Sequence, residues 1–349
     1  MPERFLFAIA ARDLALPPPS VDRAESLPHA RPVARRRTFR GFLVAAKILV
    51  SVALLAAVVA ASDLGAVRAL LVRLDPGHAL LAVVLLAGIA LVSGLRWCLV
   101  GRAIGAPLPL RDCVSLMLVG TFFTQVLPTS IGGDAVRILL AGRHGLPYGR
   151  AFSGVMLERA SGLLALVLMV AGGTLWLGAR IDPPLLRLTL LASLPALLAA
   201  LGLLCSLDLL ALPRPLARLA RPFFALAADA RRVMLAPMVS LVLLSLSAVA
   251  QLLTVAAVFV LAHGLGLALD FAAALAVVPA IVLITFVPLS FAGWGLREGA
   301  SAVMLAFVGI AAEQAVAVSV LLGLGSLAAG LPGCLLWLRS RHRASTTPH

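Results

Sequence analysis

The sequence predicts an all-α polytopic membrane protein with about six full transmembrane helices and two re-entrant broken-helix hairpins. Of its 349 residues, 62% are hydrophobic and 13% are charged, and the mean hydropathy is +1.07, which leaves too little polar surface to enclose a soluble core. Continuous apolar runs of membrane-spanning length favour helices over alternating β-strands. The clearest of these runs are 42–62, 78–95, 160–178, 185–207 and 239–262.

A sequence motif that occurs twice predicts the two hairpins. Residues 127–137 read LPTSIGGDAVR and residues 287–297 read VPLSFAGWGLR, so both fit P-x-S-x-x-G-x-x-x-R at an offset of 160 residues. Proline removes a backbone donor and glycine loosens the backbone, and lipid tolerates such breaks only where protein or water surrounds them. The repeated break indicates the functional centre of a membrane protein with two related halves.

The first half of the chain begins with a polar tail at 1–41, which we expect to be disordered and cytoplasmic. The first two spans are expected at about 42–62 and 78–95. Residues 112–127 and 135–141 flank the first copy of the motif, and each is too short to cross the membrane as a full span. We therefore expect them to form a re-entrant hairpin that enters the membrane from the cytoplasm.

Two more spans complete the first half, and the second half then repeats the order of a span, a broken pair and a last span. The expected elements are a third, fourth and fifth span, a second broken pair and a last span, at about 157–178, 185–207, 237–262, 271–287 with 299–310, and 314–338. The membrane domain thus covers 42–338, with half-repeats at about 78–208 and 237–338 and a basic cytoplasmic tail at 339–349.

The arginines set the predicted orientation. The net charge is +14, and every basic residue except Lys47 is an arginine. The arginine-dense tails and loops, including one with Arg96, Arg102 and Arg111, fall on one side when the spans are counted, which is the positive-inside pattern. This pattern explains the charge better than nucleic-acid binding does, with contact to anionic lipid headgroups as a secondary use. Both termini are expected to be cytoplasmic.

The parity of the spans predicts an inverted repeat. Three full spans separate the two copies of the motif. Because each span carries the chain to the other side, an odd number places the two hairpins at opposite faces of the membrane. Inverted repeats of this kind are associated with alternating access around a site at the bilayer midplane.

The first copy supplies a candidate anion site. Gly132 and Gly133 permit close backbone approaches, Asp134 stands where an N-cap would start a half-helix, and Arg137 follows. Free N–H groups at a helix start, together with an arginine, suit an anion such as a lipid phosphate. Alternatively, Asp134 and Arg137 pair with each other and only stabilise the break. We favour binding because charges inside membranes are usually functional.

The second copy is not equivalent to the first. Trp294 replaces the aspartate, and it either lines a lipid groove or anchors the chain at the interface. Arg297 and Glu298 follow; because neighbours on a helix do not face each other, we expect them to reach different partners across the repeat interface.

Glu158 and Arg159 open the third predicted span. A first-turn glutamate suits the helix dipole, so capping is one role; the other, which we favour, is an ion pair with Arg137 or Arg297 in a central cavity. The candidate substrate-binding residues are Ser130, Gly132, Gly133, Asp134, Arg137, Glu158, Arg159, Ser290, Gly293, Trp294, Arg297 and Glu298.

No motif points to a cofactor, a metal or a catalytic residue. The four cysteines (Cys98, Cys113, Cys205 and Cys334) and six histidines lack metal-ligand spacing, and we expect the cysteines to be small hydrophobes in the bundle. The chain carries neither a phosphate-binding GxxxxGK[ST] loop nor a nucleophile elbow with a plausible base.

Three segments, LPTSIGGDAVR, LERASGLL and VPLSFAGWGLREG, resemble in order and spacing the transmembrane domain of lysylphosphatidylglycerol synthase. This domain also occurs in free-standing flippase-like proteins and beside some lipid-linked sugar transferases. The resemblance covers about 42–338 and implies a bacterial inner-membrane protein that moves a phospholipid or another lipid-linked amphiphile between leaflets. The residues that match the family's polar positions are Asp134, Arg137, Glu158, Arg159, Arg297 and Glu298.

The resemblance does not extend to the synthase's soluble aminoacyltransferase domain, so we expect no enzyme activity. Transport of a lipid is the leading hypothesis. One alternative is a non-catalytic membrane subunit that serves a lipid-modifying enzyme or glycosyltransferase encoded separately. A less favoured one is an enzyme on lipid-linked substrates, with Asp134 or Glu158 as general base. The expected partners are a membrane lipid and such an enzyme, and no nucleic acid.

Overall fold

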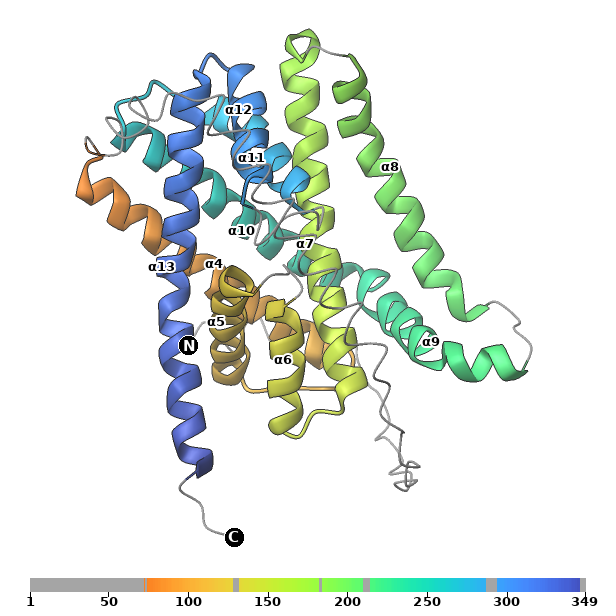
Figure 1. The fold of residues 1–349 in the computed structure, drawn as a ribbon. Coiled ribbons are helices and arrows are strands. Elements are labelled where there is room, and N and C mark those ends of the chain that lie inside the picture. Colours follow the sequence, from red (N-terminus) through yellow and green to blue (C-terminus); the bar gives the residue numbers. More distant parts are fainter. Residues whose placement is uncertain are drawn as a thin grey trace, which may run out of the picture.

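The computed structural model describes residues 72, 74–127, 132–181, 184–209, 214–286 and 294–345. Over these residues the protein is helical without strands, which confirms the all-α fold. Five helices are long and apolar enough to cross a membrane (Figure 1): α4 (Pro76–Ala103), α7 (Tyr148–Leu177), α8 (Pro184–Ser206), α10 (Pro237–Gly264) and α13 (Ala312–Ser345). They correspond to the last five predicted spans, whereas the span expected at 42–62 and the tail at 1–41 lie outside the described residues.

Each predicted broken pair consists of two short helices. The first pair is α5 (Leu110–Val126) and α6 (Gly132–Arg143), and the second is α11 (Phe271–Thr285) and α12 (Leu296–Ala306). Their lengths of 17, 12, 15 and 11 residues fall short of the roughly 20 that a bilayer requires. The tips at 128–131 and 287–293 lie outside the described residues, and so do the candidates Ser130, Ser290 and Gly293.

One helix was missed and others begin earlier than predicted. The arginine-rich stretch between the fourth and fifth spans, expected to be a loop, contains α9 (Arg214–Met234). A search for apolar runs misses an amphipathic helix because arginines recur along it. For the same reason α7 begins at Tyr148, before its apolar stretch, and α12 begins at Leu296. Two short 3₁₀ turns, Gly178–Arg180 and Leu207–Leu209, flank α8.

The two hairpins lie at opposite ends of the long helices. The first part of α7 contacts α6 through Glu158, and its last part packs closely on α11, where Gly173 lies against the backbone of Ala276. Conversely, the N-terminal half of α13 contacts α12 through Ser319, and its C-terminal half packs on α5 through Gly333. Figure 1 shows α5 and α6 toward one end of α13, and α11 and α12 toward the other.

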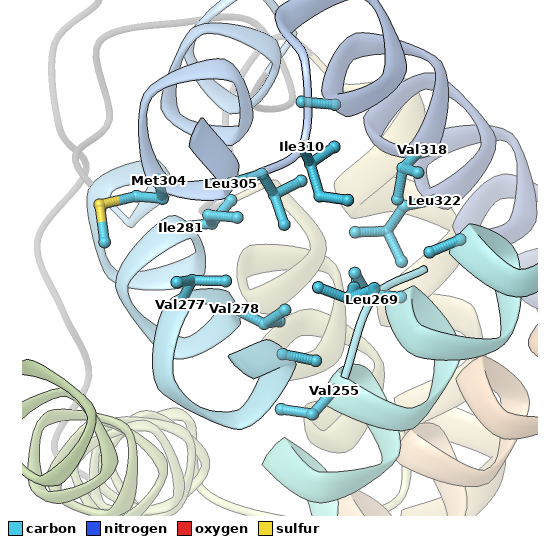
Figure 2. Packing of buried hydrophobic residues seen from close by; sticks show 14 of the residues in the cluster. Val255, Leu269, Val277, Val278, Ile281, Met304, Leu305, Ile310, Val318 and Leu322 are labelled. Carbon is cyan, nitrogen blue, oxygen red and sulfur yellow. The ribbon is translucent and has the colours of Figure 1, made fainter. Parts of the chain in front are cut away.

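The apolar core is largest around the second hairpin. Figure 2 shows buried side chains from α10, α11, α12 and α13 packed in one cluster, which fixes α12 against α13. Large apolar side chains on the outer faces of the long helices are exposed instead, among them Leu80, Leu175, Leu188 and Leu241. Such a surface suits lipid and would be unfavourable in water.

Candidate functional site

Arg96 is the first member of a buried charge cluster. It lies on α4, which continues to Ala103, so the residue is 6% exposed inside the bundle and not in the cytoplasmic loop that the sequence predicted. The apolar run ended at 95 only because Arg96 itself interrupts it. Its guanidinium donates to the Ser247 hydroxyl of α10 at 3.0 Å and pairs with Glu158 of α7. Gly162 leaves space for this guanidinium, because a Cβ there would lie 3.2 Å from Nη1.

Asp134 and Arg137 form the part of the cluster that α6 contributes. Because α6 begins at Gly132, Asp134 lies inside the first turn and is not the N-cap that we predicted. Its carboxylate accepts a hydrogen bond from Arg137 Nη2 at 2.5 Å and pairs with Arg159 of α7. Both terminal nitrogens of Arg137 donate to Glu158 Oε2 at 3.3 Å. Glu158 thus bridges two arginines, one of them the partner that the sequence predicted.

The surroundings of Arg137 hold its side chain in place. The guanidinium lies over the Trp97 ring, 5.2 Å from the centroid, and donates to the Met117 sulfur at 3.0 Å. Gly133 allows α6 to approach α5, since a Cβ there would overlap the Gly120 carbonyl oxygen. A Cβ at Gly120 would in turn lie 2.7 Å from Arg137 Cδ. Both glycines are therefore required for the arginine to be buried between the two helices.

The described groups of the cluster carry a net positive formal charge, and one of them touches the second hairpin. Three arginines face two carboxylates, which leaves one positive charge in excess when all five groups are ionised: Arg96, Arg137, Arg159, Asp134 and Glu158. Four of the side chains are buried, while Arg159 is 31% exposed. The Arg159 guanidinium lies 5.7 Å from the ring centroid of Phe286, the residue that ends α11. The second hairpin therefore touches the accessible side of the cluster.

The second copy forms a separate, neutral site. Arg297 Nη2 donates to Glu298 Oε1 at 2.7 Å, and Arg297 Nε and Glu298 both contact the Ser319 hydroxyl at 3.1 Å. The expectation that the two residues reach different partners was wrong. Glu298 Oε2 accepts the Gly295 N–H at 2.6 Å, which folds the carboxylate back over the helix start. The Arg297 guanidinium reaches the Glu298 carboxylate in this position because Gly323 leaves space for it.

Trp294 and a small cavity complete this second site. The Trp294 ring lies 4.6 Å from Arg297 Cζ, a cation–π contact that neither predicted role included. A cavity of about 30 Å³ borders Arg297 and Ser319 and is otherwise mainly apolar. This volume has room for about two waters and is far below the size of a lipid headgroup. Among the described residues, this cavity beside Arg297 cannot hold a lipid headgroup.

The two halves differ at the residues that carry the charge. Ser319 of α13 contacts Arg297 as Glu158 of α7 contacts Arg137, and Ala257 of α10 corresponds to Arg96 of α4 when the two helices are aligned on their first residues, Pro237 and Pro76. The second half thus lacks both the bridging carboxylate and the arginine below it. Sequence reasoning missed Arg96, Trp97, Ser247 and Ser319 as neighbours of the motifs. The signal for Arg96 was available, because the apolar pattern resumes after it.

Metal chemistry finds no support among the described residues, since no three His, Cys, Asp or Glu side chains there form a group that could hold an ion. The helices α4 and α5 do bring together two cysteines that are distant in sequence. The Cys98 and Cys113 thiols both donate to the Leu108 carbonyl, at 3.5 and 4.0 Å. Both are buried, as small hydrophobic side chains in a core are expected to be.

The fold and the cluster define a polytopic helical membrane protein with two broken hairpins and a buried charge cluster between α4, α6 and α7. Over residues 44–333 the chain matches the lysylphosphatidylglycerol synthase TM region, and it belongs to this family. This match confirms the resemblance that the three segments carry. Among curated proteins, no match to the chain is found.

Proposed function

We propose that the protein moves an anionic phospholipid or another lipid-linked amphiphile between the leaflets of the bacterial inner membrane. The observation that carries this proposal is the cluster of arginines and carboxylates buried between α4, α6 and α7, which touches the end of the second hairpin. Charges inside a membrane are usually functional, and the planar guanidinium suits phosphate oxygens in a bidentate arrangement. The lipid phosphate would bind these arginines.

The paired carboxylates give the site a way to release its cargo. Asp134 and Glu158 already occupy Arg137, so an incoming phosphate competes with them and is held only as strongly as this exchange permits. Arg159, which is partly exposed, would contact the headgroup first. Because the cavity beside Arg297 is too small for a headgroup, one hairpin would move away for the headgroup to enter, and the other for it to leave. Transport of this kind makes or breaks no covalent bond, so we propose no enzyme activity.

The orientation follows from the arginines outside the bundle core. We propose that both termini, and the loop between α6 and α7, face the cytoplasm, because the arginine-dense segments lie on that side. The first hairpin then opens to the cytoplasm and the second to the opposite face.

Lipid translocation by full-length protein in liposomes tests the proposal. Fluorescent analogues of phosphatidylglycerol and phosphatidylcholine report arrival in the outer leaflet. We expect wild-type protein to move the anionic analogue, Arg137→Ala to slow it at least about tenfold, as for loss of a charged contact of about 1.4 kcal/mol or more, and Arg297→Ala to slow it less. Arg137→Lys keeps a charge but loses the bidentate geometry, and should be slowed too.

Arg187→Gln, at an exposed position of α8, is the matched control and should transport at the wild-type rate. Cooperative thermal unfolding of each variant shows that it is folded. If Arg137→Lys is folded and translocates like wild type, or if wild-type protein moves no lipid, the proposal is wrong.

A second proposal accommodates the closure of the site. Charges that satisfy one another in a closed bundle also suit a non-catalytic membrane subunit that positions a lipid-modifying enzyme or a glycosyltransferase encoded separately. Co-purification of such an enzyme, with no translocation by the protein alone, would favour this function over transport.

A further inference from the structure

The amphipathic helix α9 connects the membrane spans α8 and α10 and takes no part in the charge cluster. In Figure 1 it lies beyond the end of α8 and turned across it. One face of its second half is buried against α4, α7 and α10, in a cluster with Val100, Ile104, Leu157 and Leu243. The α9 residues of this buried face are Leu226, Ala227, Ala230 and Val233.

Two ion pairs fix α9 at one end of the bundle. The buried Asp229 carboxylate accepts a hydrogen bond from Arg150 Nη1 at 2.7 Å. Arg150 lies in the first turn of α7, next to the loop that joins α6 to α7. Arg231 pairs with Asp208, just after α8. The helix therefore lies at the end of the bundle where the first hairpin opens.

One face of α9 is basic by its sequence. By helical spacing, positions 214, 218, 221, 225, 228 and 232 share one face, and four of them are arginines while the other two are alanines. Among the positions of this set whose side chains are described, Ala225 and Arg232 are exposed. The only acidic residue in the sequence of α9, Asp229, is buried against Arg150. The four arginines of this set thus share their face with no acidic residue of α9.

Two large apolar side chains at α9, Phe223 and Leu235, are uncovered. Phe223 lies opposite the basic face by helical spacing, and yet it is 54% exposed. Leu235, directly after the helix, is 67% exposed. An apolar face on one side and arginines on the other are the features of a helix that lies in the membrane interface, with its apolar side among the acyl chains and its cations at the headgroups.

We propose that α9 is an interfacial helix whose arginine face binds anionic phospholipid headgroups at the membrane surface where the first hairpin opens. Its connections to α8 and α10 are short, so it cannot leave the bilayer surface to meet a soluble polyanion at a distance. The uncovered Phe223 and Leu235 favour a lipid surface over a nucleic acid, which offers no apolar layer. This surface is independent of the proposed transport site.

Spin-labelled lipids test the proposal with the full-length protein in phosphatidylcholine bilayers. A trace of labelled phosphatidylglycerol or phosphatidylcholine reports the fraction of lipid that the protein immobilises. We expect a preference for phosphatidylglycerol of at least about twofold at low salt, which falls at about 1 M salt because exposed charges are screened. The double variant Arg218→Gln/Arg232→Gln should abolish most of this preference.

The double variant Arg180→Gln/Arg187→Gln removes the same charge from the other end of α7 and from α8, and it should keep the preference. An unchanged preference in Arg218→Gln/Arg232→Gln would overturn the proposal. So would a wild-type protein that shows no lipid preference and instead co-purifies with nucleic acid or an acidic protein released by salt.

Discussion

At the scale of single residues, the cluster is a functional arrangement more than a stabilising one. Buried ion pairs rarely exceed the stability of well-packed apolar side chains, but removing one partner leaves an uncompensated charge. Glu158 is the most sensitive member, because it is the only carboxylate that contacts both Arg96 and Arg137 among the pairs described. Its loss would leave two buried guanidiniums facing an amide.

We therefore expect Glu158→Gln to destabilise the protein by about 3–5 kcal/mol, measured as a fall in the free energy of unfolding or in Tm in detergent. Glu313→Gln is the control, because Glu313 lies in the first turn of α13 and is only partly buried. This control should stay within about 0.5 kcal/mol of wild type. Equal effects of the two substitutions would show that the buried network contributes nothing to folding.

The sequence identified part of this cluster and missed the rest for a physical reason. Asp134, Arg137, Glu158 and Arg159 stood out because charges interrupt apolar segments there. Arg96 was assigned to a loop because a hydropathy search ends a span at its first charge, although a helix tolerates a buried arginine when a partner is available. That partner, Glu158, is 62 residues away in the chain, and no local pattern reveals such a contact.

At the scale of elements, glycines decide which helices touch. Gly173 of α7 and Gly333 of α13 lie at an offset of 160 residues, and each meets the backbone of a hairpin helix in the opposite half. Helices in lipid associate by close packing of small residues, since lipid supplies no hydrophobic driving force. Each hairpin is thus held both by its own half and by the long helix of the other.

The neighbouring glycines Gly172 and Gly173 allow a matched test of this contact. A Cβ at Gly173 would lie 2.8 Å from Ala276 Cα, whereas a Cβ at Gly172 meets no atom within 4 Å. Gly173→Ala should cost about 1–3 kcal/mol through overpacking, while Gly172→Ala should be neutral or stabilise by up to about 1 kcal/mol. Thermal unfolding of both variants measures the difference, and a Gly173→Ala protein as stable as Gly172→Ala would contradict the close contact.

At the scale of the whole molecule, counting spans predicts that the two hairpins are related by inversion. Among the described residues, α7, α8 and α10 are the three helices between the two copies that are long and apolar enough to cross a membrane. The unpredicted α9 leaves the parity intact, since its arginines exclude it from the helices apolar enough to cross a membrane. Counting spans could not predict that the two sites differ in charge. This difference appears only when Ser319 and Ala257 of the second half are compared with Glu158 and Arg96 of the first.

The central claim is that the hairpins open to opposite faces of the membrane, and labelling from each side tests it most directly. His144 lies in the exposed loop after α6, and Ala311 in the exposed loop after α12. His144→Cys and Ala311→Cys are treated with a membrane-impermeant maleimide in inside-out vesicles and in spheroplasts, with wild-type protein as the blank for its native cysteines. We predict that His144→Cys reacts only in inside-out vesicles and Ala311→Cys only in spheroplasts. Reaction of both from the same side would contradict the inverted repeat.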